Sequence, residues 1–267
     1  MFSCCSQTSR SDALMIDRKK RKKFGQNYLI DPVTIHKIIK SIGLDHQLPY
    51  LEIGPGHGAI TDGFIGAINN YSAVEIDHEN IEFLSKKYGD QQINLISQDI
   101  LSFNFESLPE NVKIIGNLPY NIASQIIIKI LTSKVNPKDL HFMVQKEFAD
   151  RLCAKPGDKS WSKISIKSQV LFFNESLFEI DPIAFDIKPK VTSSFIRMTP
   201  LKNPIVKKAD FHSFSKFIDV CFQSKRKSLK NNLKDLLIDA DFGLDHFKKR
   251  PEEITLDQYK ELFKMIK

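Results

Sequence analysis

Hydrophobic residues recur at near-helical spacing in the stretch that follows residue 30. Asp31-Pro32 precedes this stretch and supplies an N-cap acceptor and a first-turn proline, and Gly43 ends it. The apolar positions between them are Val33, Ile35, Ile38, Ile39 and Ile42. The pattern predicts an amphipathic helix between Asp31 and Gly43.

Short apolar runs then alternate with helical stretches, which is the pattern of βαβ units. The runs lie at 50–53, 71–76, 93–96, 112–115 and 140–144. Right-handed crossovers would join them into a mostly parallel sheet with helices on both faces and ligands at the carboxyl ends of the strands. Two further strand-like runs, near 164–173 and 194–198, are expected to complete the sheet with an antiparallel edge.

The composition changes beyond Pro200 and Pro204, where strand alternation stops. Helical stretches are predicted at 211–221, 228–238 and 256–266, with Thr255 as the N-cap of the last. We therefore expect an α/β domain over residues 24–203 and a small all-helical domain over 204–267. Residues 1–23 are expected to form a flexible, basic N-terminal tail.

Charge adds a candidate partner to this outline. The chain has 39 Lys+Arg against 32 Asp+Glu, a net charge of +7, and residues 18–23 are all basic (RKKRKK). Such clustering favours a polyanion such as nucleic acid, although charge runs are more often solvated surface. No apolar run is long enough for a membrane helix, and residues 1–17 lack the apolar segment of a secretory signal.

The four cysteines have neither zinc-site spacing nor the density of a disulfide framework. We therefore expect a cytoplasmic protein without a metal site.

A glycine-rich turn follows the strand predicted at 50–53. The glycines of Glu52-Ile53-Gly54-Pro55-Gly56-His57-Gly58 are spaced G-x-G-x-G, and Pro55 removes an N–H that could bind a pyrophosphate. The spacing disfavours NAD and favours a cofactor without phosphates, although an ordinary tight turn would also fit it.

Two acids end the next strands. Glu75 lies roughly 20 residues after the turn, where a carboxylate accepts hydrogen bonds from ribose hydroxyls. Asp99 follows the third strand, where its carboxylate either accepts from the amino group of a cofactor adenine or merely caps a turn.

The sequence Asn117-Leu118-Pro119-Tyr120 ends the fourth predicted strand. An adenine amino nitrogen is a poor nucleophile, so catalysis has to hold both of its hydrogens and aim its lone pair. The Asn117 side-chain oxygen and a backbone carbonyl held by Leu118-Pro119 supply two acceptors, and Tyr120 supplies a ring for stacking on a flipped base. The alternative is a type I turn before a helix.

Taken together, these motifs resemble those of the KsgA-type ribosomal RNA adenine dimethyltransferases. The resemblance covers nearly the whole chain after the tail. It rests on FGQNYLID (24–31), EIGPGHGAIT (52–61), VEID (74–77), GNLPYNI (116–122), QKEFADRLCAKPGDK (145–159), PKVTSSF (189–195) and FQSKRKSLKNNL (222–233).

The resemblance implies a class I, Rossmann-like methyltransferase domain followed by a helical RNA-binding domain. It also implies S-adenosylmethionine as the methyl donor and two adjacent adenines near the 3′ end of 16S rRNA, in the 30S subunit, as the substrate. The product would be N6,N6-dimethyladenine, and the chain is expected to be monomeric.

The resemblance also assigns residues. The cofactor site would consist of Gln26, Asn27, Leu29, Gly54, Gly56, Glu75, Asp99 and Asn117. Phe185 would pair with Tyr120 in stacking the target base, although it could instead be a core residue. Arg151, Arg226 and Lys227 would contact RNA, although residues 225–227 could instead be a solvated helix end. The chain departs from the family pattern around Phe185 and at residues 161–166, and Lys225 stands where arginine is common.

Two alternatives stay open from the sequence. An Erm-type methyltransferase that acts on 23S rRNA shares the cofactor motifs, although Leu118 favours the small-subunit branch. The chain could instead act chiefly as a ribosome-assembly factor that binds the subunit without depending on turnover.

Overall fold

The computed structural model describes residues 27–89, 93–224, 226–234 and 245–266. Gln26, Lys225 and the basic tail therefore lie outside the described residues. Within the described part of the chain, no helix is long and apolar enough to cross a membrane.

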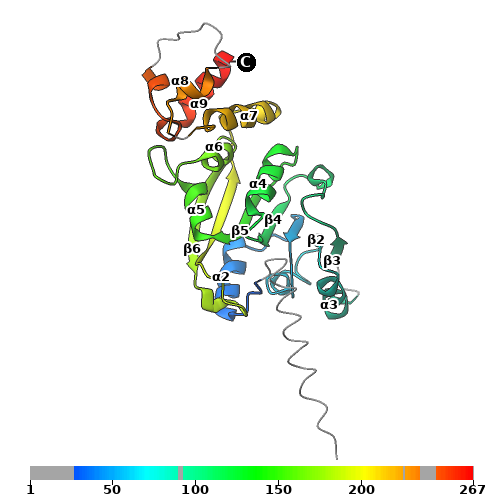
Figure 1. Cartoon of the computed structure of the whole chain (residues 1–267). Coiled ribbons are helices and arrows are strands. Elements are labelled where there is room, and N and C mark those ends of the chain that lie inside the picture. Colours follow the sequence, from blue (N-terminus) through cyan, green and yellow to red (C-terminus); the bar gives the residue numbers. More distant parts are fainter. Residues whose placement is uncertain (1–26, 90–92, 225, 235–244, 267) are drawn as a thin grey trace, which may run out of the picture.

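A seven-stranded sheet runs through the described residues (Figure 1). Its strands are β1 (Tyr50–Ile53), β2 (Tyr71–Glu75), β3 (Ile93–Ser97), β4 (Lys113–Asn117), β5 (Asp139–Gln145), β6 (Phe172–Ile180) and β7 (Ser193–Pro200). The order across the sheet is β3-β2-β1-β4-β5-β7-β6. The first five strands pair in parallel, whereas β7 runs antiparallel to both of its neighbours.

The strand order reverses between β1 and β4. The chain runs outward from β1 to β2 and β3, then returns to pair β4 with the other side of β1. In open α/β sheets a ligand binds beside such a switch point, at the carboxyl ends of the strands. The register pairs Ile53 with Gly116, so the glycine turn after β1 lies next to Asn117.

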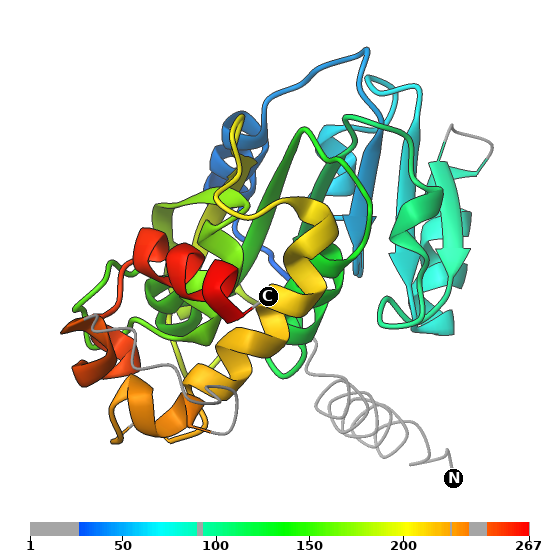
Figure 2. The same ribbon diagram turned by 90° about the horizontal axis from the view of Figure 1, so that it is seen from above.

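Helices and turns cover the sheet (Figures 1 and 2). In chain order the helices are α2 (Pro32–Ile42), α3 (His78–Tyr88), α4 (Ala123–Thr132), α5 (Lys146–Cys153), α6 (Lys163–Gln169), α7 (Phe211–Cys221), α8 (Leu229–Leu233) and α9 (Leu256–Ile266). Side chains alternate between the two faces of β5: Leu140, Phe142 and Val144 pack with α4, α5 and α6, whereas Met143 packs with α2.

The structure confirms the predicted α2 and five parallel strands. Asp31 caps α2 by accepting from the Thr34 N–H at 2.8 Å, and the cap after its last turn is Gly43. The strand at 194–198 is β7, on the antiparallel edge as expected.

The strand predicted near 164–173 is wrong over its first half. Residues Lys163–Gln169 form α6, and a strand begins only at Phe172. Ser162 and Ser165 form a capping box that starts the helix. Because the helix is buried nearly all round, its apolar residues lack the one-sided pattern that would distinguish a helix from a strand.

The C-terminal helices share one continuous core with the sheet region. Phe214 on α7 and Tyr259 on α9 belong to the same buried cluster as Phe142 on β5. The Trp161 indole N–H also donates to the Ile254 carbonyl at 3.2 Å. The domain division at 203/204 stays a prediction, because α7 packs directly on α4 and α6 of the larger part.

Predictions for the C-terminal helices agree with the described residues. Helices α7 and α9 have the expected bounds. Thr255 caps α9, accepting on its hydroxyl from the Gln258 N–H at 3.3 Å. Helix α8 covers Leu229–Leu233, and the remainder of the stretch predicted at 228–238 extends beyond the described residues.

Candidate active site

A cavity of about 270 Å³ opens at the switch point, and the predicted site residues surround it. Of the positions expected to bind cofactor or substrate, those that line it are Asn27, Leu29, Gly54, Gly56, Glu75, Asp99, Asn117, Leu118, Pro119 and Tyr120. These residues come from the N-terminal segment and from the ends of four strands. The structure therefore brings together positions that are up to 93 residues apart in the sequence, from Asn27 to Tyr120.

The glycine turn leaves room at the wall of the cavity. Gly54 and Gly56 have φ angles of +65° and +57°, in the left-handed region that favours glycine. A Cβ atom on Gly56 would lie 2.8 Å from the Tyr28 ring, and one on Gly116 would lie 2.5 Å from the Ile53 carbonyl oxygen. These glycines let the neighbouring strands and segments approach closely enough to form the site.

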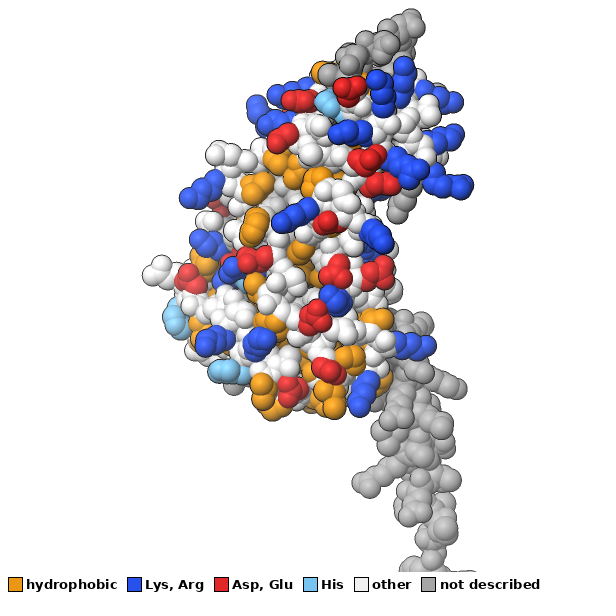
Figure 3. Space-filling model, turned by 90° about the vertical axis from the view of Figure 1, so that its left-hand side faces the viewer, with side chains coloured by type: hydrophobic (Ala, Val, Ile, Leu, Met, Phe, Trp, Pro, Cys, Tyr) orange, Lys and Arg blue, Asp and Glu red, His pale blue; other side chains and the backbone are white. Residues whose placement is uncertain are grey.

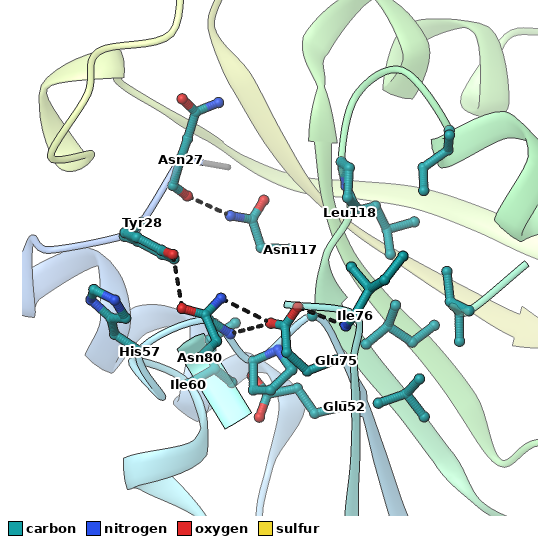
Figure 4. A pocket seen from close by; sticks show the side chains of 18 of the residues that line it. Asn27, Tyr28, Glu52, His57, Ile60, Glu75, Ile76, Asn80, Asn117 and Leu118 are labelled. Carbon is teal, nitrogen blue, oxygen red and sulfur yellow. Dashed lines mark hydrogen bonds between the residues drawn. The ribbon is translucent and has the colours of Figure 1, made fainter. Parts of the chain in front are cut away.

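Glu75 is buried at the end of β2, and its carboxylate accepts four hydrogen bonds (Figure 4). The N–H groups of Ile76 and Asp77 donate to Oε1 at 2.8 and 2.9 Å. The Gly56 N–H and the Asn80 side-chain amide donate to Oε2, both at 3.2 Å. This network holds a negative charge at the position where ribose hydroxyls are expected.

Asn117 is oriented by a neighbour from the N-terminal segment. Its Nδ2 donates to the Asn27 carbonyl at 2.9 Å (Figure 4). Because the amide nitrogen is used in this way, the Oδ1 atom is the part of the amide left to accept a hydrogen bond from a ligand. The expected role of Asn117 as an acceptor therefore agrees with this geometry.

Tyr120 borders the cavity and is held by Ser193. The two hydroxyl oxygens lie 2.6 Å apart. Burial raises the pKa of the Tyr120 hydroxyl, while the hydrogen bond with Ser193 acts in the opposite direction. The phenol is therefore neutral at physiological pH, which suits a ring that stacks on a base.

Phe185, expected to stack on the same base, lies in the core instead. Its side chain is 2% exposed, and its backbone forms a β-bridge with Leu29. The ring offers no open face to a base in this structure. The geometry thus gives no support to a stacking role for Phe185, whose position instead anchors the N-terminal segment beside the cavity.

Asp99 forms an Asx turn in addition to lining the cavity. Its Oδ1 accepts from the Leu101 N–H at 2.9 Å. The structure therefore confirms the turn, and the predicted contact between Asp99 and a cofactor adenine stays a prediction.

The three predicted RNA contacts lie apart from the residues that line the cavity. Arg226 and Lys227 are exposed in the turn between α7 and α8. Lys and Arg side chains gather at the end of the molecule that the C-terminal helices form (Figure 3). Arg151 is partly buried near the end of α5, where its guanidinium lies 5.4 Å from the Phe148 ring centre.

The cavity wall also contains residues that sequence reasoning did not assign to the site, among them Tyr28, Glu52 and Asn80. Tyr28 stands between two predicted residues, and Asn80 lies five positions after Glu75, in the first turn of α3. Asn80 could have been recognised as a polar residue on the side of the predicted helix that faces the sheet, where apolar residues are usual. Neighbouring Asp77 caps this helix, as expected for a turn residue.

Glu52 is a buried carboxyl group beside the cavity. Thr61 and Tyr71 donate their hydroxyls to its Oε2 at 2.5 and 2.6 Å. Burial raises the pKa of Glu52 from 4.5 to about 7, although the two hydrogen bonds act in the opposite direction. The folded protein therefore favours the protonated form more strongly than the unfolded chain does.

Stability should consequently depend on pH at this position. The contribution of Glu52 is fully present below pH 4.5 and is lost as the pH rises through 7. Relative to Glu52→Gln, which cannot ionise, the wild type is expected to lose about 2 kcal/mol of unfolding free energy between pH 5 and pH 8. Urea denaturation of both proteins at the two pH values measures this difference, and parallel pH profiles would contradict the assignment.

The strand order and the position of the cavity define a class I S-adenosylmethionine-dependent methyltransferase. A model of the family described as "Ribosomal RNA adenine dimethylase" matches residues 17–267. The chain therefore belongs to the ribosomal RNA adenine dimethylase family.

Curated relatives agree with this assignment. A protein of Hahella chejuensis named "Ribosomal RNA small subunit methyltransferase A" is 38% identical over 250 residues, covering 91% of this chain and 92% of the relative. A protein of the same name from Pseudomonas aeruginosa is 37% identical over 248 residues, covering 91% and 92%. The family resemblance inferred from the motifs is thus confirmed.

Solved structures confirm the fold. A dimethyladenosine transferase from Plasmodium falciparum superposes with a TM-score of 0.76 at 22% identity, covering 88% of this chain and 95% of that one. The 23S rRNA methyltransferase ErmE superposes with a TM-score of 0.65 at 24% identity, covering 90% and 99%. At these identities the similarity concerns the fold alone.

Proposed function

We propose that this chain transfers methyl groups from S-adenosylmethionine to the N6 amino groups of two adjacent adenines near the 3′ end of 16S rRNA, in the small ribosomal subunit. The observation that carries the proposal is the orientation of Asn117. Its amide presents an acceptor at the switch point, beside a turn shaped for a cofactor. Two curated relatives that match 91% of this chain are named for the small subunit.

The cavity suits S-adenosylmethionine on chemical grounds. Glu75 provides the acceptor for ribose hydroxyls, Asp99 provides one for the adenine amino group, and Gly54 and Gly56 admit the ligand to the backbone. Asn27 and Leu29 complete the wall from the N-terminal side. When bound, the sulfonium of S-adenosylmethionine supplies a methyl group that is already activated for transfer.

The residues of the chain then need only to position the target nitrogen. Asn117 Oδ1 and the Leu118 carbonyl hold the two amino hydrogens and localise the nitrogen lone pair, which raises its nucleophilicity. After the first methylation one N–H hydrogen remains, so one acceptor suffices for the second transfer. Tyr120, steadied by Ser193, stacks on the adenine ring.

Binding of the RNA involves a different part of the molecule. The basic end formed by the C-terminal helices, including Arg226 and Lys227, provides charge for phosphate groups. Such a surface also suits a role in assembly of the small subunit, which can coexist with catalysis. The Erm-type alternative is disfavoured, because ErmE shares the fold at 24% identity, whereas the curated relatives share 37–38% of the sequence.

One experiment tests the substrate. Unmethylated small and large subunits are incubated separately with the protein and methyl-labelled S-adenosylmethionine, and the labelled nucleotides are then mapped. Label is expected at adenines of the small-subunit RNA, as N6,N6-dimethyladenine. Label confined to the large subunit would overturn the proposal in favour of the Erm-type function.

A further inference from the structure

Asn80 is a buried polar residue in the first turn of α3, and no role in the proposed reaction has yet been assigned to it. Its side chain is 3% exposed and lines the cavity. A buried amide is unfavourable unless it is hydrogen-bonded, and an apolar residue of similar volume would fill the same space. A polar residue is therefore favoured at this position because its amide has hydrogen-bond partners, not because the helix requires one.

Those partners connect two sides of the cavity (Figure 4). The Tyr28 hydroxyl donates to Asn80 Oδ1 at 3.0 Å, and Asn80 Nδ2 donates to Glu75 Oε2 at 3.2 Å. The Glu75 carboxylate only accepts hydrogen bonds, so it fixes Nδ2 as the end of the amide that faces it and leaves Oδ1 to accept from Tyr28. If the amide were reversed, Oδ1 would face Glu75 Oε2, and two acceptors would repel one another.

Tyr28 belongs to the N-terminal segment and lies directly against the glycine turn. Its ring stacks on the His57 ring, with centroids 3.9 Å apart and planes inclined by 21°. The missing Cβ of Gly56 makes room for the same ring. The Tyr28 side chain thus extends across the glycine turn from the N-terminal segment to α3.

The backbone of Tyr28 is attached on the opposite side. Its N–H donates to Asp186 Oδ1 at 3.1 Å, and its carbonyl accepts from the Asp186 N–H at 3.0 Å. The backbone of Tyr28 therefore holds the N-terminal segment to the loop after Phe185, and the side chain of Tyr28 holds the same segment to Asn80 on α3.

We propose that Tyr28 and Asn80 form a latch that holds residues 27–29 over the cofactor and keeps Glu75 in its ribose-binding orientation. The inference rests on the proposed function, because it requires the cavity to hold S-adenosylmethionine. The latch acts on retention of the cofactor. The backbone pair between Tyr28 and Asp186 holds the Asn27 carbonyl next to Asn117 without the phenol, so removing the hydroxyl alone is expected to leave the target amino group in position.

Tyr28→Phe tests the latch by removing only the hydroxyl. Loss of one such hydrogen bond is expected to raise the Kd of S-adenosylhomocysteine about fivefold, with a matching rise in its dissociation rate. The KM for S-adenosylmethionine should rise by the same factor, whereas kcat at saturating cofactor stays near the wild-type value. Calorimetry, stopped-flow displacement and steady-state kinetics provide these measurements.

Two further variants separate the latch from a general loss of stability. Asn80→Leu and the double variant with Tyr28→Phe complete a mutant cycle, and the double variant should bind no more weakly than Asn80→Leu alone. Tyr50→Phe is the matched control. The Tyr50 hydroxyl donates to the Gly43 carbonyl and accepts from the Asp45 N–H, but Tyr50 does not line the cavity. Tyr50→Phe should have a lower Tm than the wild type and an unchanged Kd for S-adenosylhomocysteine.

The results can contradict the latch and the proposed function separately. Unchanged affinity in folded Tyr28→Phe, or additive effects in the cycle, would overturn the latch while the proposed function stands. A loss of kcat without a change in KM would also overturn it, since the hydroxyl would then act on the transfer step. If the wild-type chain does not bind S-adenosylhomocysteine, both the latch and the proposed function fail.

Discussion

Replacing Asn117 with alanine is expected to lower kcat for methyl transfer by about 10²-fold or more, while binding of the small subunit is retained. The variant removes the acceptor that holds one amino hydrogen of the target, and it removes no phosphate contact. Single-turnover transfer from labelled S-adenosylmethionine measures the rate, and filter binding measures subunit affinity. Transfer at a near wild-type rate would eliminate the mechanism in which Asn117 positions the nitrogen.

Two comparison variants make this result specific. Asn69→Ala changes an exposed asparagine that does not line the cavity, and it should transfer methyl groups normally.

A chain in which Arg226 and Lys227 are both neutralised should show the opposite pattern from Asn117→Ala. Its RNA affinity should fall and depend less steeply on salt, because fewer counterions are released on binding.

Glu75→Gln is expected to weaken binding of S-adenosylhomocysteine by about 10- to 100-fold. Glutamine removes the charge that four N–H groups surround, and its own NH₂ group would face those donors. Calorimetry on the folded variant gives the Kd, and thermal denaturation reports the accompanying loss of stability. An unperturbed Kd in a folded variant would remove Glu75 from the cofactor site.

Glu82→Gln provides the control for that measurement. Glu82 is exposed on α3 and does not line the cavity, so the same change of charge and shape occurs near Glu75 in the sequence but outside the cavity. Its affinity for S-adenosylhomocysteine should match the wild type. A shared loss of affinity would instead point to long-range electrostatics.

The parallel sheet could be predicted because β1, β2, β4 and β5 are mostly buried on both faces and bounded by turn residues, whereas the edge strand β3 is only partly buried. Glycines 54 and 56, Glu75 and Asn117 follow those strands, so topology alone brought them to one edge. Helix α6 was misread because a helix buried nearly all round has no polar face to reveal its period.

The contacts of the site were harder to predict than its members. The sequence does not show that the Asn27 carbonyl orients the Asn117 amide, because the two residues are far apart in the chain. Asn80 escaped notice because a polar residue in the first turn of a helix is usually solvated. Phe185 was assigned by resemblance, whereas its burial depends on how the N-terminal segment packs.

The core that the C-terminal helices share with the sheet has a consequence for how the enzyme recognises its substrate. Because α7 packs on α4 and α6, the C-terminal helices cannot move away without exposing apolar side chains of the shared core, so the basic end lies at a fixed distance from the cavity. If the basic end binds phosphate groups as proposed, the enzyme selects a substrate in which the phosphates and the target adenine are separated by that distance. A folded RNA meets this condition, whereas a free nucleotide does not.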